Sequence, residues 1–137
     1  MDAPGTEPPA PSVMPVTVLL VDDEPDMRVL ARVLLEGAGI EVVGEAEDGL
    51  VALERYRDLD PPPVPTVILL DNMMPGMSGM EAARQILAQA PDQIVVLFSA
   101  YLSQDIKVEA EGIGVAACVS KTQVNDLPQI VRSLTGR

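Results

Sequence analysis

Histidine and tryptophan are absent from this chain of 137 residues, cysteine occurs once, and aromatic residues make up only 2% of the composition. A single cysteine excludes an intramolecular disulfide framework, and the lack of histidine excludes a cysteine–histidine metal cluster. A metal site in this chain would therefore be built chiefly from oxygen ligands.

Long apolar runs and an excess of positive charge are also missing. No segment approaches the roughly 20 apolar residues of a membrane-spanning helix, and the N-terminus lacks the basic and apolar regions of a secretory signal. Nine basic against 21 acidic residues give a net charge of −12, which argues against direct nucleic-acid binding. We expect a cytoplasmic protein that does not insert into membranes, with 47% hydrophobic residues, enough for one core.

Prolines dominate the first segment, residues 1–15. We predict a disordered, proline-rich tail, since such a composition offers little to bury. A proline-rich docking ligand is the alternative interpretation, but composition is its only support. Residues 16–137 form the predicted domain.

The predicted domain contains four apolar runs that each end in a polar residue. Residues 16–21 lead into Asp22-Asp23-Glu24, and residues 66–70 lead into Asp71. The other two runs end at Ser99 and Lys121. Continuous apolar runs are typical of strands in a parallel sheet covered on both faces, and ligands bind outside the carboxyl ends of such strands.

The three aspartates would therefore meet at one edge of the sheet. Each carboxylate disfavours ionisation of its neighbours, so the cluster calls for a cation, and oxygen ligands favour Mg²⁺. Taken singly, Asp71 is also compatible with a turn, and Asp22-Asp23-Glu24 with a helix N-terminus that begins at Pro25.

A chemical role follows from the same residues. An aspartate can attack phosphorus and hold an acyl phosphate, while Mg²⁺, the Lys121 ammonium and the Ser99 hydroxyl would neutralise the phosphoryl oxygens. The chain contains no histidine, so a phosphohistidine donor would have to be another molecule.

These motifs, together with Pro75, Gly76, Gly79 and Phe98-Ser99-Ala100, resemble the receiver domain of two-component response regulators over residues 16 to about 134. The resemblance implies that Asp71 is the phosphoacceptor and that Mg²⁺ is bound by Asp23 directly, Asp22 through water, Asp71, and the backbone carbonyl of Met73. It also implies that Ser99 and Lys121 sense the phosphoryl group.

The fold class follows from alternating strands and helices, which predict a parallel sheet with helices on both faces. We predict five strands and five helices, at 25–36, 48–57, 79–90, 104–111 and 125–134. The resemblance implies a flavodoxin-like doubly wound sheet in the order 2-1-3-4-5. Leu30 and Leu50 are expected to face the core, and Asn125 to cap the last helix.

Three residues depart from the usual pattern of the family. Thr122 stands where proline usually follows the lysine, and Cys118 replaces the usual aromatic switch residue. Met73 is the third departure. The resemblance implies that Met73 and Tyr101 flank the path of the hydrolytic water, so we predict slow dephosphorylation because an apolar and an aromatic side chain exclude water. Cys118 and Tyr101 are the two candidate switch positions.

We expect a stand-alone signalling domain of a phosphorelay rather than an enzyme, phosphorylated by a histidine kinase or histidine phosphotransfer protein. Its downstream protein target would bind the face formed by the 104–111 helix, the Cys118 strand and the C-terminal helix. Three alternatives are a pseudo-receiver that acts as an interaction module without phosphorylation, a phosphatase or phosphotransferase, and a dinucleotide-binding domain. Met73 argues against a phosphatase or phosphotransferase, because such an enzyme would need an acid at this position. The lack of a GxGxxG motif after the first strand argues against a dinucleotide-binding domain.

Overall fold

A five-stranded parallel sheet in the order β2-β1-β3-β4-β5 organises the chain. The structure, a computed structural model, describes residues 15–59 and 65–136. The strands are β1 (Thr17–Val21), β2 (Glu41–Ala46), β3 (Val67–Leu70), β4 (Ile94–Ser99) and β5 (Ala117–Ser120). The order matches the prediction, and it places β1 and β3 side by side in the middle of the sheet.

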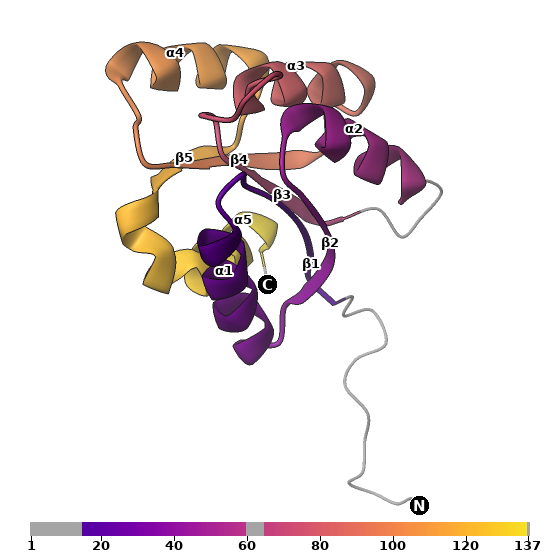
Figure 1. The fold of residues 1–137 in the computed structure, drawn as a ribbon, viewed down its shortest axis with the longest axis vertical. Helices are drawn as coiled ribbons and strands as arrows, with labels where there is room; N and C mark the ends of the chain where they lie inside the picture. The colour runs from indigo at the N-terminus through magenta and orange to yellow at the C-terminus, as the bar shows by residue number, and fades with distance from the viewer. Residues whose placement is uncertain (1–14, 60–64, 137) are drawn as a thin grey trace, which may run out of the picture.

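Helices cover both faces of this sheet. They are α1 (Pro25–Gly37), α2 (Gly49–Asp58), α3 (Gly79–Gln89), α4 (Gln104–Ile113) and α5 (Leu127–Thr135), with the 3-10 helix η1 (Lys121–Asp126) before α5. Figure 1 shows α2, α3 and α4 on one face of the sheet, and α1 and α5 on the other. The fold is the predicted doubly wound, flavodoxin-like arrangement.

Two hydrophobic clusters hold these layers together, because successive strand side chains point to opposite faces. Leu19 and Val21 of β1 pack into the cluster under α2, α3 and α4, which includes Ile86. Val18 and Leu20 pack into the cluster under α1 and α5. Every residue of β1 and β3 is buried, so the two strands that lead to the acidic residues have fixed positions.

Helix orientation and boundaries differ in detail from the sequence predictions. Leu30 and Leu50 are 41% and 56% exposed, whereas Ala31 and Leu35 of α1 and Ala52 and Leu53 of α2 are buried. The prediction failed for Leu30 and Leu50 because both helices carry apolar residues on more than one side, so the 3.6-residue period did not decide which of neighbouring apolar residues is buried. The predicted cap was also wrong, since Asp126, and not Asn125, is the N-cap of α5.

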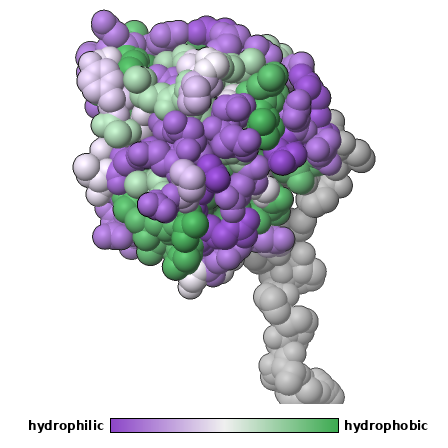
Figure 2. All heavy atoms as spheres, in the orientation of Figure 1, coloured by the Kyte–Doolittle hydropathy of each residue, from purple (hydrophilic) through white to green (hydrophobic). Residues whose placement is uncertain are grey.

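The surface is mostly hydrophilic in the view of Figure 2, with hydrophobic residues gathered in the lower part, where Figure 1 places α1. Val29 and Val33 of that helix are 62% and 61% exposed. Within residues 15–59 and 65–136, no helix is long and apolar enough to cross a membrane. The predicted tail at residues 1–15 falls almost entirely outside the described residues.

Candidate functional site

The polar strand ends meet where the strand order reverses. From β1 the chain crosses to β2 on one side, and β3 lies on the other side of β1. Val21 and Leu70 are in register at the ends of β1 and β3, so the residues that follow them, Asp22 and Asp71, lie side by side. Ligands of open α/β sheets bind in the crevice formed at such a reversal.

Asp71 is 3% exposed, and both of its carboxylate oxygens have partners. Oδ1 accepts hydrogen bonds from the Ser99 hydroxyl at 2.9 Å and from the Met73 backbone N–H at 3.1 Å. Oδ2 accepts a hydrogen bond from Lys121 Nζ at 2.9 Å. Three donors from β4, the β3–α3 loop and the end of β5 therefore fix the orientation of this carboxylate.

Lys121 is the positive centre of the site, and its ammonium contacts three carboxylates. Nζ lies 2.9 Å from Asp22 Oδ2, 2.8 Å from Glu24 Oε1 and 2.9 Å from Asp71 Oδ2. Burial by itself lowers the pKa of Lys121, but its hydrogen bonds with Glu24 and Asp71 and its ion pair with Asp22 together outweigh burial and raise the pKa well above 10.5. Lys121 is therefore charged throughout the physiological pH range.

Asp22 has an incomplete set of partners. Its Oδ1 accepts the Glu24 backbone N–H at 2.9 Å, but among the described residues Oδ2 is the only buried side-chain oxygen or nitrogen without a well-formed hydrogen bond. The contact of Oδ2 with Lys121 at 2.9 Å is thus an ion pair of poor angular geometry. Burial raises the pKa of Asp22 above its usual value, and Lys121 opposes this shift.

These features fit a divalent cation. Asp22, Asp23 and Asp71 each bring one carboxylate oxygen to within 4.8 Å of the others, and Asp23 is partly exposed to solvent. A hard cation that keeps several waters, such as Mg²⁺, suits one or two carboxylates and an open side. Asp22 Oδ2, which accepts no well-formed hydrogen bond, would be coordinated by such an ion or would accept hydrogen bonds from its waters.

The loop after Asp71 is held against the start of α3 by hydrogen bonds that Asn72 accepts and by close backbone packing. Asn72 accepts the Met80 N–H on its side-chain oxygen at 2.9 Å and the Gly79 N–H on its carbonyl at 3.1 Å. A Cβ at Gly79 would lie 2.9 Å from Asn72 Cα and 2.8 Å from the carbonyl carbon of Asp71. Only glycine allows the start of α3 to approach the Asp71 peptide this closely.

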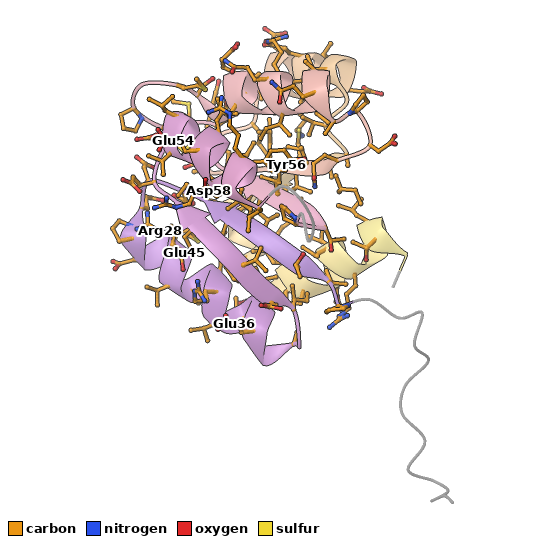
Figure 3. All side chains as sticks on the ribbon, turned by 90° about the vertical axis from the view of Figure 1, so that its right-hand side faces the viewer. Arg28, Glu36, Glu45, Glu54, Tyr56 and Asp58 are labelled. Atoms are coloured by element: carbon orange, nitrogen blue, oxygen red, sulfur yellow. The ribbon has the colours of Figure 1, made fainter. Side chains whose placement is uncertain are left out.

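The β1–α1 loop has a support of its own. Arg28 of α1 donates to the backbone carbonyl of Asp22 and, at 3.2 Å, to Glu45 of β2. Figure 3 shows Arg28 and Glu45 near each other at the β2 edge of the sheet. Arg32 Nε donates to the other oxygen of Glu45 at 2.6 Å. Arg28 therefore joins the Asp22 backbone to Glu45, and Arg32 holds the same glutamate against α1.

The remaining predicted residues lie around the rim of the site. Met73 and Tyr101 are 59% and 60% exposed, and Cys118 is half-buried against the cluster under α2, α3 and α4. Met73 and Ile106 of α4 line an open groove of about 560 Å³ beside the site. The structure gives no contact for the Met73 carbonyl, so its role as a metal ligand stays a prediction.

Glu24 is the residue that the sequence interpretation left out of the site. The acids at residues 22–24 were recognised as a group, but only the two aspartates were assigned to the site. Its side chain is 61% exposed, yet it pairs with Lys121, which lies 97 residues away along the chain. Adjacency to the aspartates was the only available signal, because a sequence does not show where a lysine side chain points.

Comparison with known proteins gives a consistent result. A family model described as the response regulator receiver domain matches residues 18–132. The chemotaxis protein CheY of Listeria monocytogenes is 38% identical over 93 residues, which cover 68% of this chain and 75% of that protein. A protein-glutamate methylesterase/protein-glutamine glutaminase of Myxococcus xanthus is 40% identical over 111 residues, covering 80% of this chain but 31% of the relative.

The fold of this chain also matches that of a solved structure. The response regulator domain of Thermotoga maritima CheB is similar with a TM-score of 0.79 and 27% sequence identity. The match covers 90% of this chain and 98% of that domain. The sequence and the structure of this chain are therefore similar to the same group of proteins.

Proposed function

Since the chain belongs to the response regulator receiver domain family of two-component signalling, we propose that it accepts a phosphoryl group on Asp71 from a phosphohistidine. The donor would be a histidine kinase or a histidine phosphotransfer protein, because this chain has no histidine of its own. One observation carries the proposal: a buried aspartate at the strand-order reversal has both oxygens held by Ser99, Lys121 and a backbone N–H.

The transfer uses groups already in position. An oxygen of Asp71 attacks phosphorus, the new O–P bond forms, and the P–N bond to the donor imidazole breaks. The leaving nitrogen keeps the electron pair of that bond and takes up a proton from solvent. Ser99 and Lys121 each lie 2.9 Å from an Asp71 oxygen, so both are close enough to donate hydrogen bonds to the phosphoryl oxygens after transfer. Mg²⁺, held by Asp22, Asp23 and Asp71, would supply positive charge against those oxygens.

The output surface is proposed to be the face that carries α4, β5 and α5. α4 fully buries only Ala110, and Val108 on its outer side is 59% exposed. A helix with so little buried area shifts at low cost, so movement of α4 can relay the signal without an aromatic residue at Cys118. We propose residues 16–137 as the receiver domain and the cytoplasm as its location.

The alternative function is a pseudo-receiver, an interaction module that keeps the fold without phosphorylation. Such a module needs neither the acidic residues nor Lys121 in contact. Here all three aspartates lie within one cation-sized cluster, and Lys121 bonds to the central one. This geometry favours the phosphoacceptor.

Phosphorylation with a small acyl-phosphate donor and Mg²⁺, followed by mass spectrometry of the intact protein, tests the proposal. The wild-type chain should gain one phosphoryl group, and Asp71→Asn should gain none, because an amide cannot form the acyl phosphate. Asp92→Asn, which alters an exposed turn residue, is the matched control and should label normally. Unchanged labelling of Asp71→Asn, or no labelling of the wild type, would contradict the assignment.

A further inference from the structure

Glu24 lies at the start of α1, which is, with α5, one of two described α-helices whose N-cap side chain makes no capping hydrogen bond. It is the N-cap residue of that helix, yet its side chain makes no capping hydrogen bond. Asp48, Ser78 and Ser103, the N-caps of α2, α3 and α4, each accept a backbone N–H with their side chains. The carboxylate of Glu24 instead reaches Lys121 Nζ at 2.8 Å.

The three carboxylates around Lys121 differ in their freedom to move. The side chains of Asp22 and Asp71 are 1% and 4% exposed and accept further hydrogen bonds from backbone N–H groups. Glu24 is 61% exposed, and among the described contacts its carboxylate has no partner other than Lys121. Glu24 is therefore the carboxylate that can leave Lys121 at least cost.

Lys121 Nζ donates hydrogen bonds to Glu24 and Asp71 and forms an ion pair with Asp22. A phosphoryl group on Asp71 would bring further anionic oxygens to this ammonium, and Glu24 is the partner that they displace at least cost. We propose that Glu24 holds Lys121 in the unphosphorylated chain and competes with the phosphoryl group for it. Glu24 is thus a positioning residue that acts through Lys121, and this inference rests on the proposed function.

The competition has opposite consequences for the two ligands of the site. Without the Glu24 carboxylate, the Lys121 ammonium interacts more strongly with the carboxylates of Asp22 and Asp71. Mg²⁺ uses the same two carboxylates, so Mg²⁺ binds more weakly. The same change frees a donor for the phosphoryl oxygens, so a phosphoryl analogue binds more tightly. If Glu24 had a purely structural role, its replacement would weaken the binding of both Mg²⁺ and the phosphoryl analogue, or of neither.

The test measures two affinities in the full chain by calorimetry, first for Mg²⁺ alone and then for beryllofluoride at saturating Mg²⁺. Glu24→Gln removes the charge, and Glu24→Asp keeps it on a side chain one methylene shorter. Asp26→Asn removes an exposed acid from the first turn of the same helix and is the matched charge control.

We expect Glu24→Gln to bind Mg²⁺ about threefold more weakly and beryllofluoride about threefold more tightly, the scale of a partly exposed ion pair. Glu24→Asp should also bind beryllofluoride more tightly, because the shorter side chain does not reach Lys121. Asp26→Asn should change neither affinity by as much as twofold at 0.15 M salt, where exposed charges are screened. The melting temperatures should agree within about 2 °C, since exposed ion pairs stabilise little.

The outcomes separate the two proposals. If the wild-type chain binds beryllofluoride but Glu24→Gln leaves its affinity unchanged, or Asp26→Asn shifts it equally, the role of Glu24 is refuted and the phosphoacceptor assignment stands. If the wild-type chain does not bind beryllofluoride, the phosphoacceptor assignment fails and the role of Glu24 falls with it.

Discussion

Replacing Gly79 by alanine should destabilise the domain and disturb the acceptor residue at the same time. The added Cβ would lie 2.8 Å from the carbonyl carbon of Asp71 and 2.9 Å from Asn72 Cα, distances that real Cβ atoms do not adopt. Both atoms belong to the backbone and cannot rotate away. The start of α3 and the peptide of Asp71 must therefore move apart.

The expected cost follows from this contact. Inserting a methyl group into a packed site costs about 1–3 kcal/mol, and the upper half of that range applies because backbone rather than a flexible side chain must shift. For a chain of this size about 1 kcal/mol lowers the melting temperature by roughly 3 °C. We therefore expect Gly79→Ala to melt about 6–9 °C below the wild type, followed by far-UV circular dichroism.

Gly112→Ala is the matched control, because it makes the same chemical change inside α4. A Cβ at Gly112 would meet no heavy atom within 4 Å, and alanine is favoured over glycine in a helix by up to about 1 kcal/mol. Gly112 variants should therefore melt at the wild-type temperature or slightly above it. A Gly79→Ala protein that melts like Gly112→Ala, and labels at the wild-type rate, would refute the close approach of α3 to Asp71.

Two further predictions concern charge and water at the site. Asp22→Asn should raise the melting temperature at pH 7 in EDTA, because burial raises the pKa of Asp22 and its charged form therefore costs stability at any pH above that pKa. This gain in melting temperature should vanish below pH 3.8, where Asp22 is neutral in both the folded and the unfolded chain. Excess Mg²⁺ should make the wild type the more stable of the two proteins, because the ion binds the folded wild type. A gain that persists at low pH would show that burial of the charged carboxylate is not its cause. Met73→Asn with Tyr101→Glu should shorten the lifetime of the phosphorylated chain, measured by mass spectrometry after donor removal, because polar side chains orient the attacking water. An equal or longer lifetime would refute the idea that Met73 and Tyr101 exclude water.

The prediction from sequence succeeded where a signal is local and repeated. Apolar runs that end in Asp22, Asp71 and Ser99 define strands, since a buried parallel strand must be apolar on both faces. The same runs locate the functional edge, because parallel strands point their carboxyl ends the same way. The strand order itself came from the family resemblance and is now seen directly in the sheet.

Which neighbouring apolar residues of a helix are buried depended on information that the sequence does not contain. Leu30 and Leu50 were expected in the core but are exposed, while Leu35 and Ala52 are buried. In α1 the apolar residues cover more than one face, so several rotations bury a similar area, and the layer of neighbouring side chains decides among them.

The composition and order of residues thus determined the strands, the acidic edge and the residue types that meet there. Only the tertiary structure brought Glu24 and Lys121 together across 97 positions and brought α3 against the Asp71 peptide at Gly79. The reason is physical: the alternation of side chains along a strand is a local property of the chain. The direction of a lysine side chain and the distance between two backbones are set by every element packed around them.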